Sequence, residues 1–189
     1  MEVLLVIAII LLVFVLYWGP GQGSRQRALE TSCRRNLERT FIALQIYAAD
    51  HGGRFPVAAG ARTSEEPLDK LVPRYTSDTA AFICPLSKDP APPGGGSFLK
   101  GKISYAYYMG NTLSNTAAVL MSDAQADTLA KVRGQPVFSV TGEPPGNNHG
   151  KSGGNFLFGD GHVAATSARA EFPLPLEPGV VLLNPKSKP

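Results

Sequence analysis

The sequence predicts an α+β fold in which a long N-terminal helix, with a hydrophobic first half and an amphipathic second half, packs on a small antiparallel sheet. Three observations predict it. Residues 3–18 are almost entirely apolar, residues 24–50 repeat apolar side chains at helical spacing, and the C-terminal part carries short apolar runs between glycine-containing turns. We expect two parts, residues 1–23 as a hydrophobic helix with a flexible joint and residues 24–189 as a globular head that includes the amphipathic half, 24–52.

The first segment, Val3 to Trp18, has sixteen residues and predicts a helix of about 24 Å. Its aromatic end, Tyr17 and Trp18, suits the headgroup level of a membrane. A secretory signal peptide needs a positively charged start, whereas this chain opens with an acid, Glu2. A buried core helix is less consistent with such an unbroken apolar stretch at a terminus. The segment therefore predicts a membrane anchor, which ends where Pro20 and its flanking glycines interrupt the helix.

The second segment continues as an amphipathic helix with one face toward a sheet. It ends at Gly52-Gly53, and Pro56 prevents its continuation. The apolar stripe consists of Leu29, Cys33, Leu37, Phe41, Leu44 and Ala48, widened by Ile42, Ile46 and Tyr47.

The head is predicted to be rich in turns, because glycine and proline are frequent there. Thr63 to Leu71 predicts a short helix with Ser64 as its cap. A hairpin is expected around Gly159-Asp160-Gly161. The predicted strands are Ile103–Tyr108, Ala118–Ser122, Asn155–Phe158, His162–Ala165 and, as an edge strand, Val180–Leu183.

Composition argues against several functions. The net charge of +3 is small, and no basic stretch is interleaved with aromatic residues, so no nucleic-acid partner is expected. The sequence contains no nucleophile elbow, phosphate-binding loop or paired-cysteine zinc pattern, so we do not expect an enzyme or a resident cofactor.

Several separated motifs resemble one family. The segment Glu2–Ile10 resembles the N-terminus of type IV pilins and type II secretion pseudopilins. Ser-Cys-Arg-Arg-Asn-Leu37, the run Tyr47–Pro56 and Cys84-Pro85 resemble the prepilin-type proteins of planctomycetes and verrucomicrobia. That family also carries a motif in which nine residues lie between a histidine and an Asp-Gly pair, whereas ten residues separate His149 from Asp160 here.

The resemblance implies a pilin-like lollipop that sits in the inner membrane as a single-pass protein. It then assembles into a helical homo-oligomer, either an extracellular type IV pilus-like filament or a periplasmic pseudopilus. The implied partners are inner-membrane lipid before assembly, the pilus or secretion machinery, and a prepilin peptidase that processes a leader upstream of Glu2, with methylation of the new terminus. Glu2 would neutralise a neighbouring subunit's terminal amine. The implied assembly residues are Glu2, Val3, Leu4, Ile7, Ile10, Phe14 and Pro20.

A different class of function stays open, a membrane-anchored metal-binding or hydrolytic domain that uses His149, Asp160 and His162. Histidine and carboxylate ligands can bind zinc, but Asp160 is also suited to forming a turn by bonding backbone amides. The resemblance to pseudopilins raises calcium as well, with Asp123 and Asp127 as candidate acids. A third reading is an anchored ligand-binding module, which predicts no polymer.

The two cysteines, Cys33 and Cys84, leave two interpretations open. An exported or membrane location permits a disulfide between them. Their wide separation in the sequence is equally compatible with two unrelated buried thiols.

Overall fold

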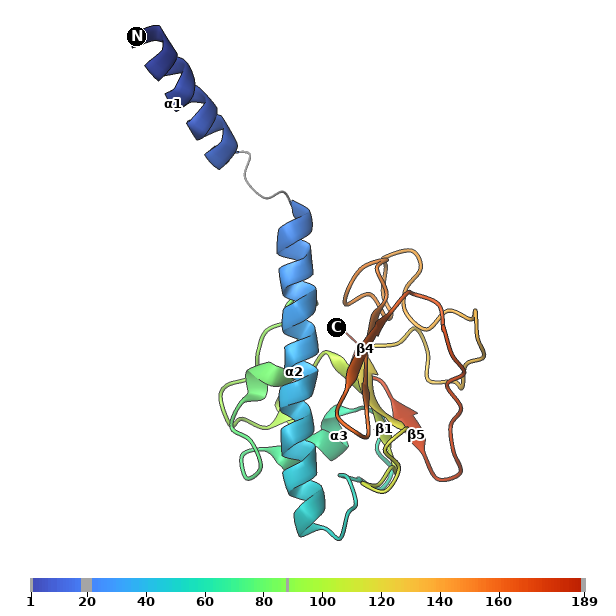
Figure 1. The fold of residues 1–189 in the computed structure, drawn as a ribbon. Helices are drawn as coiled ribbons and strands as arrows, with labels where there is room; N and C mark the ends of the chain where they lie inside the picture. Colours follow the sequence, from blue (N-terminus) through green and yellow to red (C-terminus); the bar gives the residue numbers. More distant parts are fainter. Residues whose placement is uncertain (1, 18–21, 88, 188–189) are drawn as a thin grey trace.

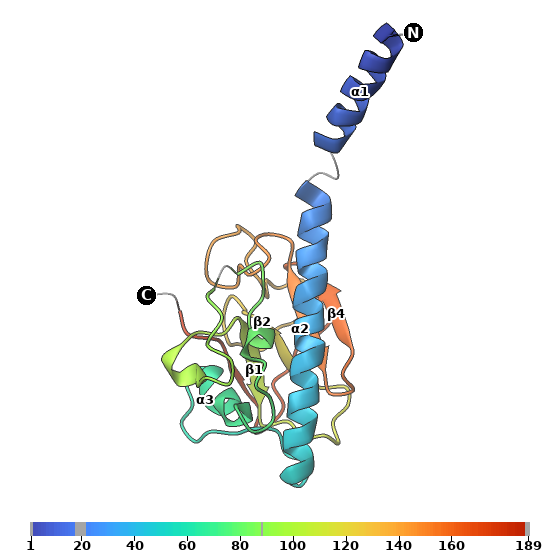
Figure 2. The ribbon, with the colours of Figure 1, turned by 90° about the vertical axis from the view of Figure 1, so that its left-hand side faces the viewer.

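The computed structural model describes residues 2–17, 22–87 and 89–187. Helix α1 (Glu2–Tyr17) precedes helix α2 (Gln22–Asp50), which lies along one side of the head in Figures 1 and 2. Met1, Trp18 and Pro20 lie outside the described residues, and so does most of the expected joint at Gly19–Gly23.

The predicted single long helix is wrong, because the chain forms two separate helices of 16 and 29 residues. At 1.5 Å per residue α1 is about 24 Å long, whereas the hydrocarbon core of a bilayer is about 30 Å thick. Within the described residues no helix is both long enough and apolar enough to cross a membrane. The predicted transmembrane helix, the single-pass inner-membrane location and the pilin lollipop built on one long helix are therefore wrong.

Helix α2 buries the face that the sequence predicted. Cys33, Leu37 and Leu44 are fully buried, and the helix packs against β3, β4 and a 3-10 turn, η2 (Thr79–Phe82). Of the three residues that were expected to widen the stripe, Tyr47 is buried, whereas Ile42 and Ile46 are exposed. The buried stripe is thus narrower than expected, and the opposite face of α2 carries charged residues, with Arg34 paired to Glu38 one turn on.

The sheet has five antiparallel strands in the order β4-β3-β2-β1-β5. The prediction of a small antiparallel sheet with Val180–Leu183 at an edge is confirmed. The strands are β1 (Tyr105–Met109), β2 (Val119–Asp123), β3 (Gly154–Phe158), β4 (Val163–Thr166) and β5 (Val181–Leu183).

The predicted hairpin joins β3 and β4. Leu157 pairs with Val163 across it, and the Phe158 amide donates to the His162 carbonyl oxygen at 3.0 Å. Gly161 adopts a positive φ of 91°, and a Cβ there would lie 2.4 Å from the Phe41 ring. Glycine is therefore required both by the turn and by the close approach of α2.

The short helix predicted at 63–71 is present as α3 (Glu65–Leu68) followed by the 3-10 turn η1 (Asp69–Leu71). Ser64 stands at its N-terminus but does not cap it. The Ser64 hydroxyl instead donates to the Tyr105 carbonyl oxygen on β1 at 2.8 Å. Its side chain therefore ties α3 to the sheet, so the predicted capping role is wrong.

The packing of α2 can be tested with a pair of substitutions on the same helix. Leu44→Ala removes a fully buried side chain, so we expect it to lower the free energy of unfolding by about 2–5 kcal/mol. Ile42→Ala changes a side chain that is 57% exposed, so its effect should stay within about 0.5 kcal/mol. Chemical denaturation followed by circular dichroism measures both. Equal losses in the two variants would contradict the assigned buried face.

Candidate functional site

Cys33 and Cys84 form a disulfide in the structure. Cys33 lies on α2, and Cys84 lies on the loop that follows η2. Both residues are completely buried. The bond joins residues 51 positions apart and links the helix covalently to the rest of the head. Of the two interpretations that the sequence left open, the disulfide is therefore the one found in the structure.

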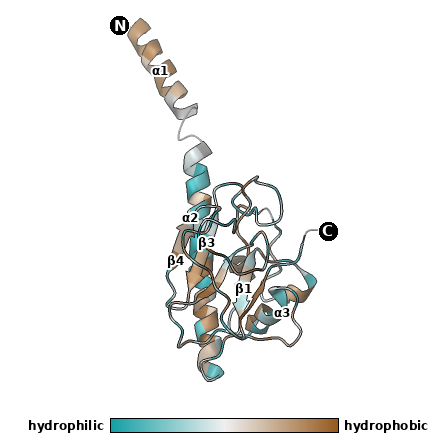
Figure 3. Cartoon of the chain, turned by 90° about the vertical axis from the view of Figure 1, so that its right-hand side faces the viewer, coloured by the Kyte–Doolittle hydropathy of each residue, from teal (hydrophilic) through white to brown (hydrophobic). Residues whose placement is uncertain are grey.

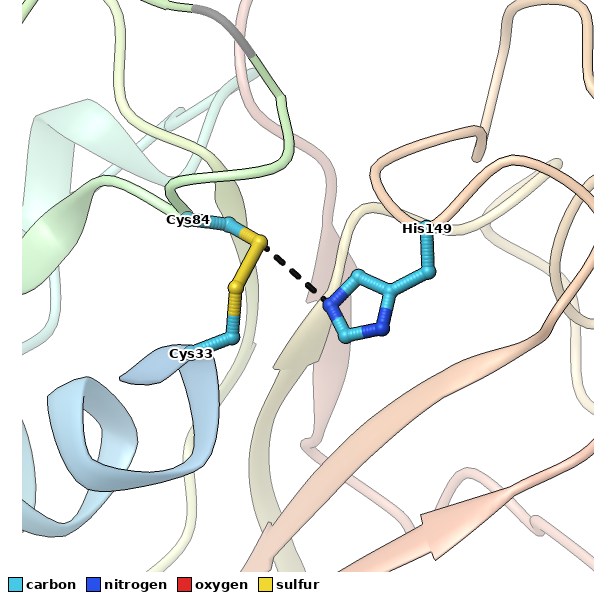
Figure 4. A group of neighbouring side chains, drawn as sticks. All are labelled: Cys33, Cys84 and His149. Atoms are coloured by element: carbon cyan, nitrogen blue, oxygen red, sulfur yellow. Dashed lines mark hydrogen bonds between the residues drawn. A yellow bond between two sulfur atoms is a disulfide. The ribbon is translucent and has the colours of Figure 1, made fainter. Parts of the chain in front are cut away.

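His149 contacts this disulfide at the sulfur of Cys84, as Figure 4 shows. Its Nε2 atom lies 3.3 Å from the Cys84 sulfur and also 3.3 Å from Oδ2 of Asp123. The imidazole is almost fully buried, and Asp123 is completely buried at the end of β2. The imidazole therefore lies where four segments meet: helix α2, the Cys84 loop, β2 and the loop before β3.

The buried carboxylate of Asp123 is compensated by several donors. Asn148 donates its side-chain amide to Oδ1 at 3.0 Å. Asn155 donates to Oδ2 through both its backbone and its side-chain amide, at 2.8 and 3.0 Å. Hydrogen bonds of this kind offset the cost of burying a carboxylate beside His149.

The charge of Asp123 changes the pKa of His149. Burial alone would lower that pKa, but the hydrogen bond to Asp123 and the charges of Asp123 and Glu30 together raise it above the ordinary value. Tyr105, which donates its hydroxyl to the Cys33 carbonyl oxygen, has its pKa raised well above the ordinary value by burial and then by Asp123. Asp123 thus contributes to the upward shift of both pKa values, that of the His149 imidazole and that of the Tyr105 phenol.

A cleft of about 840 Å³ adjoins this cluster, and His149 and Asn148 form part of its wall. Two lysines also line it, but Lys102 pairs with the buried Asp89 and Lys186 donates to the carbonyl oxygens of Leu99 and Gly101. Both lysines are therefore engaged, and the imidazole lies at the wall of the cleft with only 5% of its side chain exposed.

The predicted metal triad is not brought together. Asp160 and His162 lie in the β3–β4 turn and contact each other, with 2.6 Å between Oδ1 and Nδ1. The Asp160 carboxylate also accepts from the His162 backbone amide, and the imidazole stacks on Phe158. This is the turn-forming role that the sequence kept as the alternative. Within the described residues, the group of three potential metal ligands is instead Cys33, Cys84 and His149.

The two candidate calcium acids also separate. Asp123 belongs to the His149 cluster, whereas Asp127 accepts from the Leu129 amide and pairs with Lys131. The sequence analysis named Cys33, Cys84, His149 and Asp123 but did not connect the cysteines with His149 and Asp123. It missed Asn148 and Asn155. The run Asn147-Asn148-His149 before β3 was a signal, because amide donors next to a histidine suit a buried carboxylate.

The described assembly residues form a separate feature on α1. Glu2, Val3, Leu4, Ile7, Ile10 and Phe14 are all exposed. Figure 3 shows most of α1 in the brown of hydrophobic residues, whereas α2 alternates between hydrophilic and hydrophobic colours. Helix α1 stands clear of the head in Figures 1 and 2, so its apolar side chains are not part of the head's core.

The disulfide's contribution can be measured with the Cys33→Ala/Cys84→Ala double variant. Opening a loop of 51 residues should lower the free energy of unfolding by about 4 kcal/mol. Denaturation in a buffer with a metal chelator measures the loss. A reductant should destabilise the wild-type protein by a similar amount and leave the double variant unchanged; a variant as stable as the oxidised wild type would contradict the assigned role.

The raised pKa of His149 predicts a pH-dependent contribution to stability. A histidine whose pKa is higher in the folded than in the unfolded protein stabilises the fold. This contribution is fully present below the unfolded pKa of about 6.5 and is lost as the pH rises through the folded pKa. We expect His149→Gln to cost most stability below pH ~6.5 and progressively less above it. Urea denaturation across this range measures the difference, with the exposed His162→Gln as the control. A cost that grows with pH would reverse the sign and refute the assignment.

Comparison with known proteins gives no relative for this chain: no family model, no curated protein and no solved structure matches it.

Proposed function

We propose that the protein is a structural subunit that polymerises through α1 into a helical filament of the type IV pilus or type II secretion pseudopilus kind. One observation carries the proposal. Every described side chain of α1 from Glu2 to Phe14 is exposed, and twelve consecutive residues, Val3–Phe14, are apolar.

The distribution of these side chains indicates how many neighbours the helix needs. A helix with one apolar stripe needs one partner, whereas a helix that is apolar all round needs neighbours on all sides. Exposure is high on every side, for example at Leu4 (70%), Leu5 (65%) and Val6 (53%), which point about 100° apart around the helix. Burying one such side chain is worth about 1.5–3 kcal/mol, so bundling several copies of α1 supplies a large driving force.

The head supports the same proposal. Helix α2 is held by its buried face and by the disulfide, so the head is a rigid body that α1 can carry on the outside of a helical bundle. Glu2 lies at the N-terminal edge of the apolar stretch. A carboxylate there is costly to bury unpaired, so it favours the register in which a neighbouring positive group meets it.

The rival hydrolytic function has weaker support. Its three residues do not converge, since His149 contacts Asp123 and the disulfide, whereas Asp160 and His162 contact each other. The three residues therefore do not form the predicted hydrolytic site.

The proposal is tested by placing a charge in the middle of α1. Wild-type protein, freed of detergent, should form filaments visible by electron microscopy. Ile7→Glu should remain in small species by light scattering, because assembly would bury an unpaired carboxylate. Glu2→Ala should also lose ordered filaments, through loss of register.

The matched control is Leu129→Glu, which adds the same charge at an exposed position of the head, and it should assemble like the wild type. Near-ultraviolet circular dichroism should show an unchanged head in all variants. Filaments of Ile7→Glu indistinguishable from the wild type would refute the assignment of α1 as the assembly surface.

A further inference from the structure

We propose that the reduced protein has a zinc site made by Cys33, Cys84 and His149, with Asp123 as the fourth ligand. The disulfide and the zinc ion are then alternative links between α2 and the head. The proposal is independent of filament assembly and rests on the buried cluster alone.

The three proposed nitrogen and sulfur ligands are already gathered. The two sulfurs and an imidazole nitrogen lie within 4.8 Å of one another, and the Cα atoms of the cysteines are 4.9 Å apart. Two thiolates and an imidazole are ligands that zinc prefers. Cys33 and Cys84 come from different segments, so a shared ion holds those segments together as the disulfide does.

The distances at His149 fit a tetrahedral ion. Zinc bonds of 2.0–2.3 Å place an imidazole nitrogen about 3.5 Å from a sulfur ligand and about 3.3 Å from a carboxylate oxygen. Nε2 lies 3.3 Å from the Cys84 sulfur and 3.3 Å from Oδ2 of Asp123. With its proton on Nδ1, the imidazole presents the Nε2 lone pair to an ion between these two groups.

The surroundings meet the other requirements of a zinc site. Ligating carboxylates are usually oriented by further hydrogen bonds, and Asp123 accepts from Asn148 and Asn155. A site also needs an entry path, and His149 lines the cleft that opens to solvent.

The chemistry balances without any group from the protein beyond these ligands. A phosphine or dithiol reductant supplies two electrons, and with two protons the disulfide becomes two thiols. Zinc binding converts both thiols to thiolates and displaces any proton from Nε2 of His149, and all of these protons pass to solvent. The sulfurs must then separate to roughly 3.8 Å, the distance between two thiolates on one tetrahedral zinc.

The experiment compares the oxidised and reduced forms of the full chain at pH ~7.5, with a phosphine as the reductant. Atomic spectroscopy after gel filtration should find one zinc per reduced chain and no stoichiometric zinc in the oxidised protein. Cobalt in place of zinc should give thiolate-to-metal absorption in the reduced form only. Equal zinc in both forms, or none in the reduced form, would overturn the proposal.

Two histidine variants locate the site. In the reduced protein, His149→Ala should lower zinc affinity at least about tenfold, whereas His162→Ala, in the exposed turn, should leave it unchanged. If reduction unfolds the head, zinc should restore the near-ultraviolet circular dichroism of the wild type but not of His149→Ala. Failure of zinc to restore it, or equal behaviour of the two variants, counts against the site.

Discussion

The packing of α2 on the sheet is the constraint on which the rest of the head depends. Leu37, Phe41 and Leu44 place the helix against β3 and β4, and the Cys33–Cys84 bond keeps that face in place. The close contact of Phe41 with Gly161 shows how the helix also limits the β3–β4 turn. Because the sheet has the helix on one face, a small head of short strands can bury its main apolar core between the two.

Beside this apolar core lies a compact polar cluster. A carboxylate as deeply buried as Asp123 is costly unless it is paired and hydrogen-bonded, and Asn148, Asn155 and His149 satisfy it together. The cluster joins β2, β3 and the loop before β3 to the disulfide. The same arrangement explains the raised pKa of His149 and places an imidazole nitrogen where an ion could bind once the cysteines are reduced.

Helix α1 has the opposite character. The head buries most of its large apolar side chains in its own core, whereas the described part of α1 exposes an apolar surface that the head does not cover. The two parts therefore have separate tasks in the proposed filament, with α1 providing cohesion and the head providing the outer surface. Substitutions in the two parts should act on different measurements, assembly for α1 and unfolding for the head.

The sequence by itself determined the local elements, because periodicity and turn chemistry depend on residues that are close together in the chain. These elements are the apolar stretch, the buried stripe of α2, the hairpin at Asp160 and the edge strand near Val181. Its errors were of length and partnership. It predicted α1 and α2 as two halves of one long helix with a flexible joint, extended the stripe to Ile42 and Ile46, and grouped His149 with Asp160 and His162. Only the tertiary structure decided that His149 meets Asp123 and the disulfide, because those contacts cross 26 and 65 residues of chain and depend on how α2 and the sheet pack.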